Sequence, residues 1–542
     1  MGDQPSQWLD AVVFDLRRQF RWSFLPPLMV YFAAGISGLT AIVGTFYVKE
    51  YLGLSAAFLA GLSFWAGLPW ALKMPLGHLV DLIWRWKAVL VYLGAALIAM
   101  SLLIMYALIT FPGWMSGFMK VESWYVLSVL LAPLGYVIQD AVADAMSVEA
   151  VPRLDPSGAP LGDSEAKELH TTMQTLGRIA LISGVAFVAL LNIVMFAGIE
   201  KASDAEKAIV YGRIYLFALI IPLVSISGVL LAGLLRRRHL QELSRAGLSR
   251  QKIVAALKPA GEPTKPNPWY FIGGLGFVAM ILAVGLGDIP FAQEIVFVGS
   301  MTIVITLMRQ LAGELQPAKA RMLFGTAIII FIFRAVPLPG PGATWFEIDV
   351  LGFDQQFLSI LTLITSCLTL VGMVVLRPLM AKRGIAYIVV LLTVAAGLLS
   401  IPNIGLYYGI HEWTAPLTGG IVDARFIAII DTAIESPLGQ VAMIPMLAWI
   451  ARNAPENLKA TFFAVMASFT NLALSASSLL TRYLNEFFLV TREVRNQDSG
   501  LVEVPADYSA LGWLLITVAA ISVVAPLLTI VLVQRSPLRT RD

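Results

Sequence analysis

Two aspartates lie one helical turn apart inside an apolar stretch of the sequence. Asp140 and Asp144 fall within WYVLSVLLAPLGYVIQDAVADAMSVE, residues 124–149, which is long and apolar enough to cross a bilayer. Their i, i+4 spacing places both carboxylates on one helix face. An ionised aspartate inside a membrane costs about 2.5–3.5 kcal/mol, so such a pair faces a polar cavity, shares a proton or meets a cation. We expect a substrate or proton site here; the alternative is a packing contact closed by a basic partner.

Basic side chains also occur inside apolar stretches. Lys73 lies within an expected span, and a buried ammonium requires an anionic partner, for which Asp140, Asp144 or an anionic substrate would serve. The alternative is that the lysine extends to the aqueous surface. Arg334, in IIIFIFRAVP, is a second embedded cation and Arg178 a third. We count Lys73 and Arg334 among the candidate binding residues.

A second acidic pair occurs late in the chain. Asp431 and Glu435 lie four residues apart in RFIAIIDTAIESPLGQVAMIPMLAWIA, residues 425–451, which also contains Gln440. If the two halves of the chain are related by symmetry, both acid pairs converge on a central cavity, and all three residues are candidates for substrate or proton binding. The alternative is that Asp431 lies near the outer end of its span and is hydrated.

The composition of the chain indicates that membrane-spanning helices position these residues. The chain has 542 residues, of which 58% are hydrophobic and only 13% charged, against about 25% charged in soluble proteins. An integral membrane protein with about fourteen spans is therefore predicted. The expected spans are residues 25–48, 55–79, 88–110, 124–147, 174–199, 210–235, 268–287, 291–309, 320–338, 355–377, 384–408, 425–450, 459–487 and 509–534.

These spans fall into two groups of six separated by a hairpin of two. We expect an amphipathic segment (1–24), a six-helix bundle (25–235), a basic linker (236–267), an extra transmembrane hairpin (268–310), a second six-helix bundle (311–534) and a short tail (535–542). The arrangement is similar to the major facilitator superfamily, an all-α fold with its substrate cavity between two halves. An unrelated helical bundle is the alternative.

Charge predicts the orientation. Arg236, Arg237, Arg238, Arg245, Arg250, Lys252, Lys258 and Lys265 lie in the linker, whereas the loop at 339–354 contains Glu347 and Asp349 and no basic residue. Because basic loops stay on the cytoplasmic side, we expect the linker and both termini in the cytoplasm. No organellar targeting segment is visible, so the expected location is a bacterial inner (plasma) membrane.

The same inventory argues against other classes of protein. Cys367 is the single cysteine and the four histidines are scattered, so no disulfide framework, metal site or cofactor is expected. No glycine-rich phosphate loop with a lysine is present, and candidate nucleophiles lack histidine partners. Neither an enzyme nor a nucleic-acid-binding protein is predicted; the expected partners are the lipid bilayer, a small organic solute and a coupling proton.

Several motifs resemble those of the folate–biopterin transporter family, a branch of the major facilitators. The matching elements are Pro69-Trp70-x2-Lys73-x3-Gly77-x3-Asp81, Asp140-x3-Asp144, the stretch FRAVPLPGPGATWFEIDVLGFDQQFLS, Gly439-Gln440-x4-Pro445, and Pro455-x5-Thr461-x-Phe463-Ala464 with Ser468 and Asn471. Gly77-x3-Asp81-x3-Arg85-x-Lys87 resembles the gating loop between spans 2 and 3 of major facilitators. Val80, Asn457 and Lys459 depart from the family pattern, which marks a divergent member.

The resemblance implies a secondary active transporter of a pteridine or folate-like anion. A pterin ring presents a donor edge that a carboxylate can bind with two hydrogen bonds, and the glutamate tail of folate requires arginine or lysine. Proton-coupled alternating access is the implied mechanism, a symport driven by a proton gradient. Two alternatives remain: a transporter of another organic solute with the same fold, and a non-transporting scaffold or assembly factor that docks through its linker and hairpin.

Overall fold

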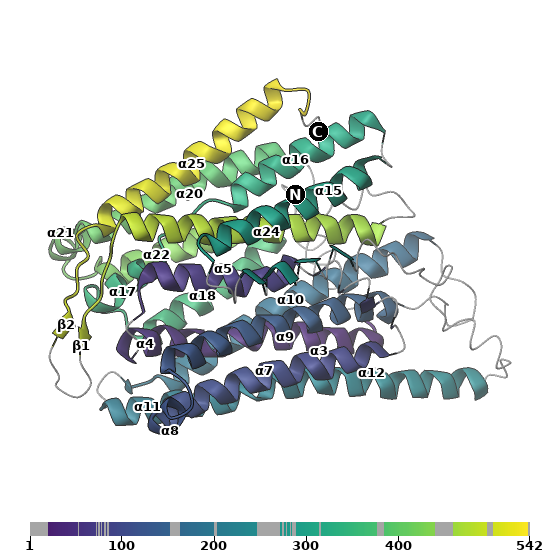
Figure 1. The fold of residues 1–542 in the computed structure, drawn as a ribbon, viewed down its shortest axis with the longest axis horizontal. Helices are drawn as coiled ribbons and strands as arrows, with labels where there is room; N and C mark the ends of the chain where they lie inside the picture. The colour runs from purple at the N-terminus through teal and green to yellow at the C-terminus, as the bar shows by residue number, and fades with distance from the viewer. Residues whose placement is uncertain are drawn as a thin grey trace, which may run out of the picture.

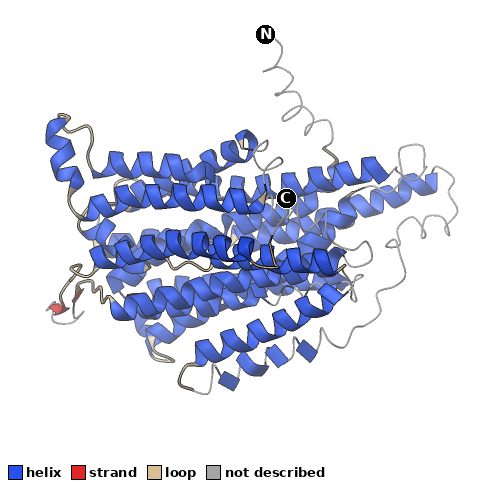
Figure 2. Cartoon of the chain, turned by 90° about the horizontal axis from the view of Figure 1, so that it is seen from above, coloured by secondary structure: helices blue, strands red, loops and turns tan. Residues whose placement is uncertain are grey.

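Long helices run side by side across the molecule, nearly all in one direction or its reverse (Figures 1 and 2). This computed structural model describes residues 20–51, 54–71, 73, 76, 79–80, 83, 86–151, 163–199, 203–245, 272–273, 276–277, 279–281, 283–284, 289–313, 316–376, 384–438, 459–495 and 502–539. The helical architecture agrees with the sequence prediction. That prediction rests on the rule that a span in lipid must satisfy its own backbone hydrogen bonds, as a helix does.

The first half of the chain supplies the helices of the first bundle. They are η2 (Trp22–Phe24), α3 (Leu25–Ile36), η3 (Ser37–Thr40), α4 (Ala41–Tyr51), α5 (Ala56–Ala71), α7 (Lys87–Thr110), α8 (Pro112–Ser116), α9 (Val121–Ala150), α10 (Asp163–Met195), α11 (Asp204–Ala218) and α12 (Ile220–Arg245). Helix α12 continues ten residues past the boundary expected at 235, so the first arginines of the expected linker are helical. Residues 1–19 and 246–271, which include most of the expected amphipathic segment (1–24) and most of the linker, lie outside the described residues.

The second half supplies one helix of the inserted hairpin and the second bundle. These elements are α15 (Ala292–Gly313), α16 (Pro317–Arg334), α17 (Pro341–Asp349), α18 (Gln355–Val375), α20 (Ile385–Tyr407), α21 (Ile410–Leu417), α22 (Ala424–Glu435), η6 (Ser436–Leu438), α24 (Lys459–Phe487), β1 (Val494–Arg495), β2 (Val502–Val504) and α25 (Leu511–Arg535). Strands β1 and β2 pair antiparallel in the loop before α25, a detail that the sequence did not predict.

Two ends of the molecule can be distinguished by these elements. We call the end that carries β1 and β2 the ribbon end, and the end at which α12 finishes the linker end (Figure 1). Within the described residues, nine helical segments are long and apolar enough to cross a membrane, and Ala56–Trp70 is a shorter apolar helix. A multi-pass membrane protein follows from these lengths and compositions.

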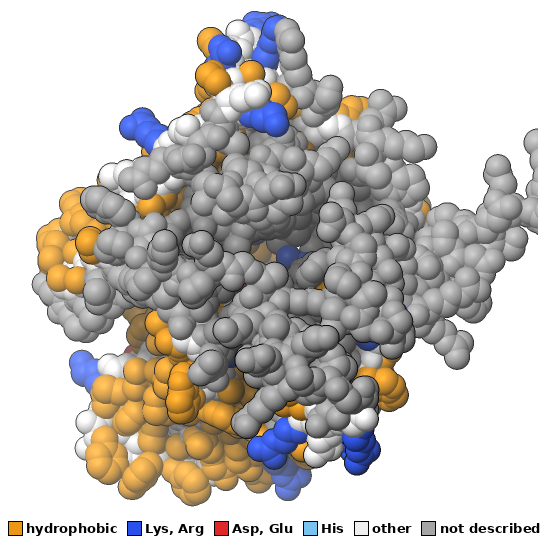
Figure 3. Space-filling view, turned by 90° about the vertical axis from the view of Figure 1, so that its right-hand side faces the viewer, with side chains coloured by type: hydrophobic (Ala, Val, Ile, Leu, Met, Phe, Trp, Pro, Cys, Tyr) orange, Lys and Arg blue, Asp and Glu red, His pale blue; other side chains and the backbone are white. Residues whose placement is uncertain are grey.

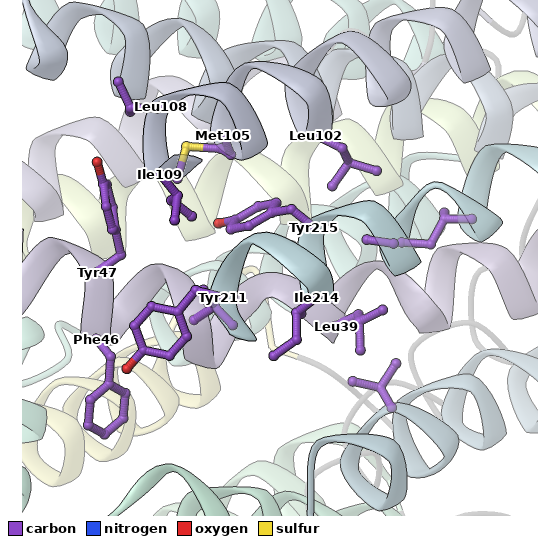
Figure 4. Packing of buried hydrophobic residues seen from close by; sticks show 14 of the residues in the cluster. Leu39, Phe46, Tyr47, Leu102, Met105, Leu108, Ile109, Tyr211, Ile214 and Tyr215 are labelled. Carbon is purple, nitrogen blue, oxygen red and sulfur yellow. The ribbon is translucent and has the colours of Figure 1, made fainter. Parts of the chain in front are cut away.

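Small residues let the helices of the first bundle approach closely. Gly94 in α7 faces Gly135 in α9, and a Cβ added to either glycine would lie 2.6 Å from the other's carbonyl oxygen. Further along α7, toward the ribbon end, aromatic and aliphatic side chains from α4, α7 and α11 fill the core, with Tyr47, Tyr211 and Tyr215 among them (Figure 4). Backbone contact of this kind is typical of helices that associate in lipid, where van der Waals packing replaces the hydrophobic effect.

The helix that continues from α16 into α17 is broken between residues 335 and 340. Gly340 has a positive φ of 80°, and Pro337, Pro339 and Pro341 interrupt the helical hydrogen bonds. Helix α24 takes over the released backbone groups through its polar side chains: Ser477 Oγ donates to the Val336 carbonyl at 2.6 Å, Thr481 Oγ1 accepts from Leu338 N at 2.9 Å, and Asn485 Nδ2 donates to the Pro339 carbonyl at 3.1 Å. The break is therefore sealed inside protein, as membrane structures require.

Two seams join the bundles. In one, α18 packs along α10, and Gln355 Nε2 at the start of α18 donates to Tyr211 Oη in α11 at 2.9 Å. In the other, α24 packs along α5, and Asn471 Nδ2 donates to the Trp70 carbonyl at 3.2 Å. Seen from the linker end, the face is hollowed near its centre, and a basic side chain is visible inside the hollow (Figure 3).

The contact between α7 and α9 predicts a stability effect. Replacing Gly94 by alanine places a methyl group against the Gly135 carbonyl and the Gln139 side chain. Overpacking of this kind costs about 1–3 kcal/mol, so the variant should unfold several degrees lower than the parent in a thermal assay of detergent-solubilised protein. Gly233→Ala, also inside a helix but with open space around the new Cβ, is the matched control. Equal melting temperatures for all three proteins would contradict the close approach.

Candidate functional site

A lysine and two aspartates meet inside the first bundle. The Lys73 ammonium Nζ lies 2.6 Å from Asp140 Oδ2 and 2.8 Å from Asp144 Oδ2. Helix α9 supplies both carboxylates from one face, as the four-residue spacing predicts, and Lys73 follows the C-terminal end of α5. The side chains of Lys73 and Asp140 are 23% and 15% exposed, and that of Asp144 is 45% exposed. Of the two arrangements considered for Lys73, the structure contains the ion pair.

Tyr31 completes this cluster from a third helix. Its hydroxyl, on α3, donates a hydrogen bond to Asp144 Oδ1 at 2.7 Å. The ring lies against α10 at Gly177, where an added Cβ would be 3.0 Å from a ring carbon. Sequence reasoning missed Tyr31, and the signal that could have found it is a hydroxyl in the otherwise apolar run LPPLMVYFAAGI. We refer to Tyr31, Lys73, Asp140 and Asp144 as the aspartate cluster.

The two aspartates are not equivalent. Asp144 has both carboxylate oxygens engaged, one by Tyr31 and the other by Lys73. Asp140 contacts Lys73 through Oδ2, and Arg178 on α10 adds a favourable electrostatic interaction. Two ionised carboxylates paired with the single positive charge of Lys73 have a net charge of −1, and the positive charge of Arg178 offsets it. Asp140 is therefore the carboxylate better placed to take an additional hydrogen-bond donor.

Arg334 lies at the end of α16, next to the break in that helix. Arg334 is the last residue of α16. The partial negative charge at the C-terminus of this helix stabilises the cationic side chain. Arg178, from the first bundle, is close enough to interact with it electrostatically. These two positive charges come from opposite bundles.

The second acidic pair lies on α22 of the second bundle. Asp431 is 6% exposed; its Oδ2 accepts a hydrogen bond from Asn403 Nδ2 on α20 at 2.9 Å, and its Oδ1 is buried without a hydrogen-bond partner among the described residues. Burial of the Asp431 side chain argues against the alternative of a hydrated residue, and its role stays a prediction. Glu435 is exposed, and Gln440 lies outside the described residues. No contact between described residues joins Asp431 or Glu435 to the aspartate cluster, so their convergence on one cavity stays a prediction.

Part of the expected gating loop can be placed. Gly77, Asp81 and Arg85 lie outside the described residues. Lys87, at the start of α7, forms an ion pair with Glu149 near the end of α9. This pair joins two neighbouring helices of the first bundle, and Glu149 lies five residues beyond Asp144 on α9, toward the linker end. Among the described residues, no group of His, Cys, Asp or Glu could hold a metal ion.

The sequence profile of the BT1 family matches residues 216–540, more than half of the chain. The folate-biopterin transporter of Synechocystis sp. (strain ATCC 27184 / PCC 6803 / Kazusa) is 22% identical over 483 residues, which cover 85% of this chain and 75% of that protein. Its name agrees with the resemblance found in the motifs.

Solved structures show the same fold. A POT family transporter in complex with 5-aminolevulinic acid superposes with a TM-score of 0.61 at 13% identity and covers 96% of both chains. The peptide transporter POT in complex with sulfate gives a TM-score of 0.58 at 15% identity, covering 96% of this chain and 98% of that chain. The likeness confirms the major facilitator fold with its two bundles. These similar proteins are transporters, not enzymes, in agreement with the sequence prediction.

The charge balance of the aspartate cluster predicts how stability responds to substitution. Lys73→Met leaves Asp140 and Asp144 facing each other without their shared cation, which should cost about 3 kcal/mol because an uncompensated buried charge remains. Adding Asp140→Asn removes that charge and should restore most of the melting temperature. Thermal unfolding of the two variants checks this, with the exposed Lys120→Met as control. The ion pair would be shown unimportant if the single and double variants melted together with the parent.

Proposed function

Since the chain belongs to the BT1 family, we propose that it is a secondary active transporter that moves a pteridine or folate-like anion by proton-coupled alternating access. The observation that supports this most directly is the aspartate cluster, in which Lys73, Asp140 and Asp144 meet inside an apolar bundle. A group of charges that is costly to bury is retained where it serves a substrate or an ion. The similar protein from Synechocystis is named a folate-biopterin transporter, which supports the choice of substrate.

Asp140 binds the donor edge of the pteridine. Its carboxylate has bonding capacity left after pairing with Lys73, and a ring that presents two N–H donors side by side matches a carboxylate in geometry. Asp144 is the anchor, because Tyr31 and Lys73 already engage both of its oxygens. Lys73 holds the two carboxylates together and contributes no charge to the anionic part of the substrate while it is paired.

Arg334 receives the anionic part of the substrate. It lies in the second bundle and interacts electrostatically with Arg178 of the first, so a carboxylate that binds near both is attracted by a positive charge from each bundle. A substrate that contacts Asp140 on one bundle and Arg334 on the other stabilises the state in which the bundles close around it. This differential binding is what couples occupancy to the change of access.

Asp431 carries the coupling proton. It lies on a different helix from Asp140, is buried, and has one oxygen that finds no hydrogen-bond donor among the described residues. An ionised carboxylate in such surroundings is unfavourable, and binding a proton removes the charge. Separate positions for proton and substrate allow both to be bound at once, which symport requires. Glu435, one turn further along and exposed, is the nearest acid from which the proton can pass.

The proposed setting is a bacterial inner membrane with the linker end in the cytoplasm. The basic residues Arg236, Arg237 and Arg238 at the end of α12 support that orientation, since positive charge is retained on the cytoplasmic side. In this orientation the ribbon end and the loop after α24 face the outside. The basic side chain visible in the hollow of the linker-end face would then be reached from the cytoplasm (Figure 3).

Uptake into proteoliposomes tests the proposal. Labelled folate, a reduced pterin and an unrelated organic anion are offered with and without an inward proton gradient. Saturable, gradient-driven uptake of folate or the pterin is expected. Gradient-driven uptake of the unrelated anion alone would assign another solute to the same fold. If a thermal assay shows that the protein is folded but none of the three solutes is transported, the alternative of a non-transporting scaffold is favoured.

The substrate role of Asp140 predicts loss of binding. Asp140→Asn removes a charged acceptor, and hydrogen bonds to charged groups contribute about 1.5–3 kcal/mol, so affinity for the pteridine should fall about 10- to 100-fold. Equilibrium binding to purified protein measures this directly. Glu412→Gln, an exposed acid on α21, is the control and should bind normally. Unchanged affinity in Asp140→Asn would remove the aspartate cluster from the substrate site.

The proton role of Asp431 predicts a different phenotype. Asp431→Asn should abolish accumulation driven by a proton gradient, because the coupling group can no longer change its protonation. Exchange of labelled for unlabelled substrate at equal pH on both sides should continue at a rate within about threefold of the parent, since the substrate site is intact. A variant that still accumulates substrate against a gradient would place the proton elsewhere.

A further inference from the structure

The inserted hairpin contacts both bundles at the ribbon end, and Gln293 is the residue that makes both contacts. Gln293, in the first turn of α15, is 9% exposed. Its Nε2 donates to the Gly61 carbonyl of α5 at 3.2 Å, and its Oε1 accepts from Arg482 Nη1 of α24 at 3.2 Å. One amide group thus connects a helix of the first bundle to a helix of the second.

The rest of α15 belongs with the second bundle. Val296, Val304 and Met308 share a buried apolar cluster with residues of α16, α20, α24 and α25, and α15 packs most extensively against α24. From the first bundle, the same cluster includes Phe64 and Leu68 of α5. If the bundles separate at the ribbon end, α15 therefore moves with α24, and the hydrogen bond between Gln293 and Gly61 must break.

A network behind Gln293 fixes the direction of its amide. Arg482 donates from Nε to Glu486 Oε1 at 2.7 Å and lies 3.9 Å from Glu294 Oε1, which also accepts a hydrogen bond from the Tyr483 hydroxyl. Because Arg482 can only donate, it holds Oε1 of Gln293 toward α24 and leaves Nε2 toward α5. An amide held in its bonding orientation forms the bond to Gly61 at little entropic cost.

Gly61 is suited to receive this contact. A Cβ on this residue would lie 2.9 Å from Gln293 Nε2 and 3.4 Å from Arg482 Cδ, so a side chain here would push the amide away. Further along the same seam, a Cβ on Gly67 would be 3.7 Å from Ser475 Oγ, and Asn471 bonds to the Trp70 carbonyl. The seam between α5 and α24 is thus narrow along its length, and α15 covers it at the ribbon end.

From this geometry we propose that the inserted hairpin is a catch that holds the ribbon end of the α5–α24 seam closed, with Gln293 as the closing group and Arg482 as the residue that positions it. The inference goes beyond the transported substrate and does not depend on it. The catch sets the proportion of molecules in which the bundles are separated at the ribbon end.

Distances between spin labels test the catch. In a Cys367→Ser background, cysteines replace Phe58 and Phe487, two exposed side chains near the ribbon ends of α5 and α24. Double electron–electron resonance on purified full-length protein then reports separation of the two helices. We expect one short distance in the parent and a second, longer population, increased at least threefold, in Gln293→Ala. Arg482→Ala should give the same change through loss of the amide's orientation.

Thr302→Ala is the matched control, because this residue lies on the same helix and its hydroxyl donates to the carbonyl of Val298 in that helix. It should reproduce the parent distance distribution.

A second readout is the rate of cysteine labelling, with Ser475→Cys introduced in the same Cys367→Ser background. Position 475 lies in the seam and is 1% exposed, so its reaction with a maleimide should accelerate about fivefold when Gln293→Ala is added. Distance distributions and labelling rates that are identical in parent and Gln293→Ala would overturn the catch. Both measurements are made without substrate, so their failure is separate from failure of the transport proposal.

Discussion

The ammonium of Lys73, shared by two carboxylates inside an apolar bundle, is the interaction on which the arrangement of the first bundle depends. Each of these charges alone would have a high desolvation cost inside the bundle. Their mutual attraction offsets that cost only while all three are present. The requirement fixes the end of α5 against α9, and through Tyr31 it fixes α3 against α9 as well. A charged cluster of this kind gains little net stability, so its presence supports the binding role proposed for it.

A second constraint is the need to satisfy every backbone group in lipid. The break between α16 and α17 exposes carbonyl and N–H groups that the helix no longer uses, and Ser477, Thr481 and Asn485 of α24 bond to them. Helices α16, α17 and α24 are tied together as a result. Arg334 benefits from the same break, because it ends α16 and therefore lies at the negative pole of a helix rather than in its middle.

The sequence predicted the helices and the aspartate pair well, for a physical reason. Long apolar runs leave the backbone no option but to form helices in lipid, and two acids four residues apart must share a face, so the local pattern is sufficient. The pairing of Lys73 with Asp140 followed from charge, since few other ions were available. The acid pair at Asp431 and Glu435 was visible by the same logic, but its surroundings were not.

The residues that were missed are neutral and act across long separations in sequence. Tyr31 bonds to a residue 113 positions away, and Gln293 contacts Gly61 at a separation of 232. A tyrosine or glutamine in an apolar stretch carries no charge that demands a partner, so nothing in the local pattern identifies which helix it faces. Long-range placement of neutral polar groups is decided by packing, which the sequence of one chain does not reveal without the fold.

The contact between Gly94 and Gly135 has a mechanical consequence. Where two helix backbones touch through carbonyl groups, neither can roll or slide past the other without a collision of main-chain atoms. Rotation of α9 about its own axis, which would be the simplest way to turn its aspartates from one side of the membrane to the other, is therefore prevented. Helices α7 and α9 therefore form one rigid unit, and in the transport cycle proposed above a change in the access of Asp140 requires this unit to tilt as a whole against the second bundle.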